Sequence, residues 1–181
     1  LSDFGAAAIP QLMDALHVGD RGTRRAAATA LGKMGRAAIP SLSDSLNDPD
    51  SDVRRGAASA LGEIGESAVP SILANLPAAD PAMAELLIGI LGQIGDATVP
   101  HLIALLHDSA TEQQTAAARA LEGIGASVVP SLIPLIEDND AHLRLLVLRT
   151  LRRIADPSAA AAFVKGLHDA DPDIRVEAVT A

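Results

Sequence analysis

The sequence predicts an all-α fold, a right-handed α-solenoid (superhelix) of about six 30-residue helix-turn-helix repeats. Proline, leucine and glycine each recur at a fixed interval of 30 residues along the 181-residue chain. Coincident periods of this length are typical of stacked helical repeats. The periodic residues are Pro10, Pro40, Pro70, Pro100 and Pro130, then Leu31, Leu61, Leu91, Leu121 and Leu151, and finally Gly5, Gly35, Gly65, Gly95 and Gly125.

Residues 50–64 are predicted to form the first helix of one unit. Gly65 is expected to end it, because glycine adopts the left-handed conformation that a helix C-terminus often requires. The other periodic glycines are expected to do the same, with Ala155 at the sixth turn. Apolar side chains recur at the 3.6-residue spacing of an amphipathic helix, namely Val53, Ala57, Ala58, Leu61 and Ile64.

A shorter second helix is predicted over about 67–76, with a buried face made of Val69, Ile72, Leu73 and Leu76. The periodic proline falls near its first turn, where a missing N–H has little cost. Aspartates such as Asp50 and Asp171 then stand at the start of the next first helix. Their carboxylates can cap its free N–H groups.

A helix pair this short has no core of its own, so each pair must bury its apolar stripe against the next. The pattern Asp-x-Asp-Val-Arg-Arg-x-Ala-Ala-x-Ala-Leu-Gly-x-Ile-Gly at residues 50–65 resembles the HEAT-like repeats of the phycobilisome-lyase type, an armadillo-like α-solenoid class. The resemblance covers the whole chain. That class includes chromophore lyases, an iron-dependent hydroxylase and many scaffolds, so the resemblance implies a fold more than a function.

Aspartate and arginine recur four residues apart at the start of the first helices. The spacing permits an ion pair within one helix, and the resemblance implies ladders between neighbouring repeats, so we expect a structural role. The pairs are Asp20 with Arg24, Asp50 with Arg54, Asp140 with Arg144 and Asp171 with Arg175. Ala84 and Gln114 replace the arginine in two units. The first of these carries larger apolar residues, which predict either a thicker core or a surface patch: Leu86, Leu87, Ile88 and Ile90.

The net charge of −9 is concentrated in the middle of the chain. Residues 56–143 carry eleven acidic residues against Arg119 alone, whereas residues 1–55 carry seven acids and seven bases. A nucleic-acid-binding protein normally shows a basic stripe, and aromatic platforms for single strands, so no nucleic-acid partner is expected. No membrane partner is expected either, since no apolar run reaches the length of a bilayer span. A cytoplasmic location is favoured.

The chain is expected to be a single repeat domain, 1–181, and a window of a longer array, because neither end resembles a polar capping repeat. A residue inserted between Asp156 and Phe163 lengthens one unit to 31 residues and displaces its proline. This insertion either changes the local superhelix or is a tolerated loop variant. The units fall near 1–19, 20–49, 50–79, 80–109, 110–139, 140–170 and a partial 171–181.

No catalytic constellation is visible, so the chain is not expected to be an enzyme, and no cofactor or metal is expected. His101 and Ser131 could pair, but no carboxylate is placed to orient the imidazole. Glu137, Asp138 and Asp140 lie in a turn where water keeps carboxylates ionised. Three histidines recur in the last turn of second helices, where a partly positive ring favours the helix end, and whole repeats separate them: His17, His107 and His168.

Binding is expected on the concave face, which second helices usually line in such ribbons. Its outward positions change from polar and acidic to apolar along the chain. Leu105 and Leu135 either line this groove or pack between helices. Pro134, four residues after Pro130, predicts a late start or a kink in its helix. The candidate contact residues are Ser71, Asn75, His101, Ala104, Leu105, Ser131, Pro134 and Leu135.

These patterns favour a non-catalytic protein–protein interaction scaffold. Its groove, particularly residues 71–135, would bind a protein or peptide of basic and apolar character. Two alternatives remain open. One is a bilin lyase-like or chromophore-handling accessory protein, with lyase-type activity. The other is an artificial or purely structural repeat array.

Overall fold

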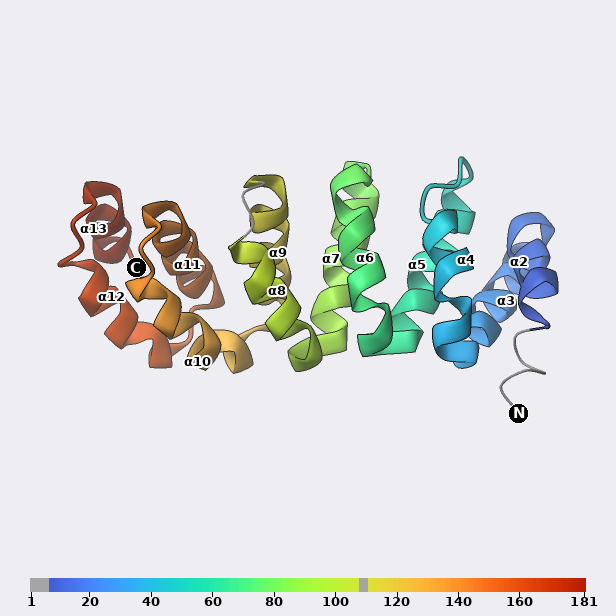
Figure 1. Cartoon of the computed structure of the whole chain (residues 1–181), viewed down its shortest axis with the longest axis horizontal. Coiled ribbons are helices and arrows are strands. Elements are labelled where there is room, and N and C mark those ends of the chain that lie inside the picture. The colour runs from blue at the N-terminus through green and yellow to red at the C-terminus, as the bar shows by residue number, and fades with distance from the viewer. Residues whose placement is uncertain (1–6, 108–110) are drawn as a thin grey trace. The chain divides into compact units, whose positions relative to one another are not determined.

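The computed structural model describes residues 7–107 and 111–181, and every regular element in these ranges is a helix (Figure 1). The chain divides into two compact units, Leu1–Ile94 and Gly95–Ala181. The predicted all-α repeat fold is confirmed. The first periodic glycine, Gly5, lies outside the described residues.

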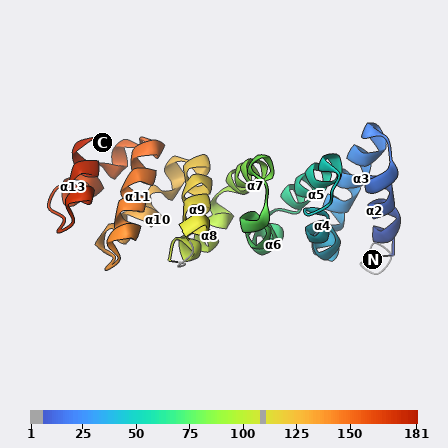
Figure 2. The same cartoon turned by 90° about the horizontal axis from the view of Figure 1, so that it is seen from above.

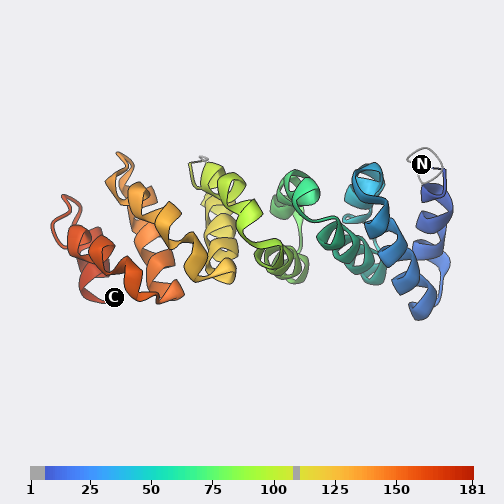
Figure 3. The same cartoon turned by 90° about the horizontal axis from the view of Figure 1, so that it is seen from below.

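The first unit alternates the predicted helix types. Its first helices pack side by side, α3 on α5 and α5 on α7, while the second helix α4 packs on both α5 and α6. Figure 2 shows these helices as two layers, and Figure 3 shows the same layers from the opposite side. The elements are α2 (Ile9–Val18), α3 (Arg21–Met34), η1 (Gly35–Ala38), α4 (Ile39–Ser45), α5 (Ser51–Ile64), η2 (Gly65–Ala68), α6 (Val69–Asn75), η3 (Leu76–Ala78) and α7 (Pro81–Ile94).

The second unit repeats the plan. Here α9 packs on α8 and α11, and α13 packs on α11 and α12. The elements are η4 (Gly95–Thr98), α8 (Val99–Leu106), α9 (Thr111–Ile124), η5 (Ala126–Val128), α10 (Val129–Leu132), η6 (Ile133–Glu137), α11 (Ala141–Ile154), η7 (Pro157–Ala159), α12 (Ala160–Gly166) and α13 (Pro172–Val179).

The first helices end as predicted, at glycines with positive φ. Gly65 has φ 75° and ψ −142°, a region that is essentially restricted to glycine. A Cβ placed on Gly65 would meet nothing within 4 Å, so the backbone conformation, and not a lack of space, requires the glycine. Ala155 replaces it at the sixth turn and adopts a different conformation, φ 55° and ψ 36°.

The first helices also begin as predicted, at aspartate caps. Asp50 accepts a hydrogen bond from the Asp52 N–H at 2.9 Å, and Asp20 accepts one from the Thr23 N–H at 2.7 Å. Each bond satisfies an N–H group that has no partner inside the helix. The cap and the glycine together set the length of these helices.

The second helices differ from the prediction of one continuous helix over about 67–76. A 3₁₀ turn, η2, covers Gly65–Ala68, and the α-helix α6 begins only at Val69. Pro70 lies in the first turn of α6, as predicted. The tighter 3₁₀ turn links the two helices directly, so almost no loop separates them.

Pro134 breaks its second helix, as predicted. The α-helix α10 ends at Leu132, and η6 continues as a 3₁₀ helix from Ile133. Proline has no N–H to complete the α-helical ladder, so the backbone shifts to the tighter form. In the 31-residue unit, Asp156 caps η7 in place of a glycine turn, and Pro157 opens it.

The core consists of the periodic aliphatic residues. Leu61, Ile72 and Leu91 are completely buried. In α7 the replacement of arginine by Ala84 is accompanied by a thicker core, since Leu87, Ile88 and Ile90 are buried and Leu86 is half-buried. Small residues allow this packing, because a Cβ on Gly56 would lie 2.7 Å from the Leu16 side chain.

Candidate functional site

The repeated arginines form a ladder between repeats. Arg24 donates to Asp50 of the next repeat at 2.8 Å, and also to the carbonyl oxygens of His17 and Gly19 at 2.7 and 2.9 Å. Arg54 reaches Asp80 at 3.1 Å in the same way. These contacts tie the end of one second helix to the cap of the next first helix. The ladder is therefore structural.

Arg144 makes the most enclosed contact of this ladder. Its guanidinium binds both carboxylate oxygens of Asp169 at 2.8 Å, and the two side chains are only 13% and 10% exposed. The hydrogen bond from Arg144 lowers the pKa of Asp169 from its ordinary value. Gln114 keeps a part of this function, because its amide donates to the Leu106 carbonyl oxygen at 3.1 Å.

The histidine positions gain a partner that the sequence reasoning missed. His17 lies 3.2 Å from Asp48, and its other ring nitrogen lies 2.7 Å from the Met13 carbonyl oxygen. His107 lies 3.9 Å from Asp138. In both pairs the aspartate follows the histidine by 31 residues. That recurring interval was the available signal.

Two of the predicted contact residues lie in the first unit, and one of them is engaged. Asn75 donates to the Ser43 hydroxyl at 2.8 Å and to the Ser71 carbonyl oxygen at 2.9 Å, and accepts from Asn47 at 3.0 Å. These bonds link α4 to α6. Ser71 is half-buried beside it. The Asn75 side chain thus supports the second-helix layer.

The other six predicted contact residues lie in the second unit. His101, Ala104, Ser131 and Pro134 are exposed on their second helices. Leu105 and Leu135 are half-buried, so each packs partly against its neighbours and leaves part of its surface to solvent. Glu137, in the adjacent turn, forms an ion pair with Lys165, and this hydrogen bond lowers the pKa of Glu137. The carboxylates of that turn are thus not paired for acid–base chemistry.

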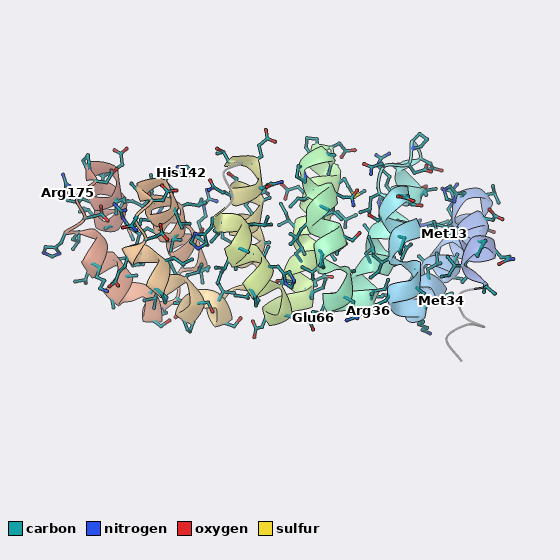
Figure 4. The ribbon with its side chains drawn as sticks, in the orientation of Figure 1. Met13, Met34, Arg36, Glu66, His142 and Arg175 are labelled. Carbon is teal, nitrogen blue, oxygen red and sulfur yellow. The ribbon has the colours of Figure 1, made fainter. Side chains whose placement is uncertain are left out.

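A hollow of about 500 Å³ lies between α2 and α4 in the second-helix layer of the first unit. We call it the acidic hollow. It is lined by the apolar Ile9 and Met13 and by three carboxylates with His17: Asp14, Asp44 and Asp48. Met13 is labelled in Figure 4. Asp14 and Asp44 are exposed, and within the described part of the chain their carboxylates make no ion pair or side-chain hydrogen bond.

A larger hollow, of about 780 Å³, lies between α3 and α5 in the first-helix layer of the same unit. We call it the arginine hollow. Four arginines line it, Arg21, Arg24, Arg25 and Arg55, together with three carboxylates, Asp50, Asp52 and Glu63. Sequence reasoning treated this region as structural because Arg24 belongs to the repeat pattern.

The described residues hold no group of three histidine, aspartate or glutamate side chains that could bind a metal ion. One helical stretch, Pro81–Leu106, is long and apolar enough to cross a membrane, with a mean hydropathy of 1.4. Core helices of soluble proteins pass the same criterion, and Leu87, Leu91 and Leu102 of this stretch are completely buried.

Comparison with known proteins gives matches at the level of the family and of the fold. Human deoxyhypusine hydroxylase in complex with glycerol is 19% identical over 98% of this chain and 73% of its own, with a TM-score of 0.50. The complex of CpcE and CpcF of phycocyanin lyase from Nostoc sp. is 21% identical over 96% and 97%, with a TM-score of 0.44. The archaeal HEAT-like repeats protein from Thermococcus onnurineus is 15% identical over 96% and 85%, with a TM-score of 0.42.

At such identities the likeness is one of fold alone. No individual characterised protein matches the sequence. A family model described as HEAT repeats matches residues 9–82 and 99–181, which is most of the chain. The chain therefore belongs to the HEAT repeat family.

Proposed function

We propose that this chain is a non-catalytic protein-interaction scaffold, and that its second-helix face binds a protein or peptide of basic and apolar character. The observation that carries the proposal is the acidic hollow. Asp14 and Asp44 present unpaired carboxylates beside the apolar side chains of Ile9 and Met13. A cationic side chain on an apolar segment satisfies both surfaces at once.

The charge of the acidic hollow favours a cation over an anion. Asp48 is already engaged, because it accepts from the Asp50 N–H at 2.8 Å and contacts His17. Asp14 and Asp44 have no such partner among the described residues. Two exposed carboxylates on facing helices repel one another, and a lysine or arginine between them removes that repulsion.

The test uses a short fluorescein-labelled peptide that alternates Lys with Leu, called the basic probe, and measures binding by fluorescence anisotropy. Asp14→Asn with Asp44→Asn should weaken binding by about threefold or more, with less difference at high salt. The control, Glu66→Gln with Glu112→Gln, removes the same charge from exposed positions outside the hollow. Equal weakening by both pairs would show that only net charge matters, and the proposed site would be abandoned.

The second-helix positions of the second unit extend the proposal. Leu105 and Leu135 keep part of their surface in solvent, beside the exposed His101 and Pro134. Leu105→Asp with Leu135→Asp should then reduce binding of the basic probe's Leu side chains while the circular dichroism spectrum and melting temperature stay nearly unchanged. If this double variant unfolds, the two leucines belong to the core and this extension is wrong.

A further inference from the structure

The arginines of this chain fall into two groups. Most are engaged: Arg24 and Arg54 bind aspartates of the next repeat, and Arg36 donates to the Ser67 hydroxyl at 2.9 Å. The rest of the engaged group pairs with carboxylates or backbone carbonyl oxygens, or has another interaction partner: Arg119, Arg144, Arg149, Arg152, Arg153 and Arg175. Within the described residues, only Arg21, Arg25 and Arg55 have no hydrogen bond or ion pair, and all three line the arginine hollow.

This concentration of unpaired cations has no structural reason. Arg21 and Arg25 are four residues apart on α3, where like charges repel. Arg25 and Arg55 occupy equivalent positions of consecutive repeats, so the packing of α3 on α5 brings a third guanidinium to the same hollow. All three side chains are exposed, so burial does not oppose a ligand. The chain as a whole carries −9, yet no carboxylate neutralises them.

The geometry points to a binding site for an acidic segment of a partner protein, and we propose that Asp or Glu side chains of that segment are held by Arg21, Arg25 and Arg55. A guanidinium presents parallel N–H donors that match a carboxylate. Three guanidiniums on two helices suit several carboxylates spaced along a chain. This site goes beyond the proposed function, because its charge and its helix layer both differ from those of the acidic hollow.

Two observations favour a peptide segment over a compact phosphate group. Asp52 and Glu63 line the same hollow, and their negative charge opposes a concentrated dianion but can accept hydrogen bonds from peptide N–H groups. A further hollow of about 440 Å³ between α5 and α7 shares Ser59 and Glu63 with the arginine hollow and is lined by Leu86 and Ile90. An extended acidic and apolar segment can therefore continue across α5.

The test uses the full chain and a labelled peptide that alternates Glu with Leu, the acidic probe, with fluorescence anisotropy as the readout. Arg25→Gln with Arg55→Gln should weaken binding by about tenfold or more, which is about 1.4 kcal/mol. The matched control, Lys33→Gln with Arg36→Gln, removes the same charge from exposed positions of the same unit (Arg36 in Figure 4). It should leave binding within about twofold. Arg25→Lys with Arg55→Lys should give an intermediate loss, since lysine keeps the charge but not the paired donors.

Three results would overturn the proposal. One is that the unchanged chain does not bind the acidic probe, and another is that both glutamine pairs weaken binding equally. The third is that a probe with phosphoserine in place of Glu binds more tightly, which would make the site a phosphate site. Failure of this site is distinguishable from failure of the scaffold proposal. The arginine variants should still bind the basic probe, and the Asp14→Asn and Asp44→Asn variants should still bind the acidic one.

Discussion

At the scale of single residues, two turn positions with the same place in the repeat have different backbone conformations. Gly65 combines a positive φ with an extended ψ, whereas Ala155 lies in the left-handed helical region. The first conformation is essentially closed to residues with a Cβ, and the second costs an L-residue other than glycine about 1–2 kcal/mol. Opposite substitutions at the two turns should therefore have opposite effects.

We expect Gly65→Ala to lower the free energy of unfolding by about 1–3 kcal/mol, because alanine must adopt a strained conformation there. Ala155→Gly should raise it by about 0.5–1 kcal/mol, because the strain at φ 55° is relieved at a small entropic cost. Urea unfolding followed by circular dichroism measures both. A change of the same sign in the two variants would show that their conformations are not the cause.

Arg144 supports a second prediction at this scale. Removing its side chain leaves the nearly buried Asp169 carboxylate without its main partner. Arg144→Gln should therefore lower the free energy of unfolding by about 2–4 kcal/mol at neutral pH. Arg175→Gln, which breaks only bonds to the carbonyl oxygens of Asp169 and Ala170, is the control and should cost less.

The effect of Arg144→Gln should depend on pH. The pKa of Asp169 is lowered in the folded chain, from an ordinary value of 3.8, by the hydrogen bond from Arg144. A lowered folded pKa adds stability above the unfolded pKa and loses it as the pH falls through the folded value. The difference between wild type and variant should be constant at neutral pH and shrink below about pH 4. A difference that stays constant down to pH 2 would exclude this carboxylate as the source.

At the scale of elements, the first helices were predictable and the second helices only in part. Residues 50–64 were expected to be helical, and α5 spans Ser51–Ile64 with Asp50 as its cap. Caps, periodicity and a terminating glycine all agree there. The second helices begin in 3₁₀ turns such as η2, whose side chains carry no distinct periodic signal. Sequence therefore located them without giving their start.

Pro134 provides the test at the scale of elements. With an N–H restored, Pro134→Ala should let α10 continue as an α-helix through Ile136 in place of η6. Stability should rise by about 1 kcal/mol or more, although less than the full cost of an interior proline, because the 3₁₀ form already recovers some bonds. Amide hydrogen exchange should show added protection at Leu135 to Asp138. No gain in protection would mean that tertiary packing, and not the proline, holds the 3₁₀ form.

At the scale of the whole molecule, summed charge concealed the candidate sites. Residues 1–55 are neutral in total, and attention in the sequence therefore falls on the acidic middle. The structure separates the opposite charges of the first unit into two layers, carboxylates between α2 and α4 and arginines between α3 and α5. Neither hollow follows from periodicity, because each depends on side chains that meet across repeats. The intervals of 26 residues from Arg24 to Asp50 and 31 from His17 to Asp48 were the only sequence traces of such contacts.

The repeat architecture also predicts how far a local change travels. Each repeat contacts mainly its neighbours, so stability is close to a sum of repeat and interface contributions. We expect Arg144→Gln to increase amide exchange in α11 and α12 while protection in α3 and α5 stays unchanged. Asn75→Ala, which removes the bonds between α4 and α6, should act only on the first unit. The double variant should lose the sum of the two single losses within about 0.5 kcal/mol. If either variant raised exchange uniformly along the chain, the 181 residues would unfold as one cooperative block, and the nearest-neighbour description would not hold.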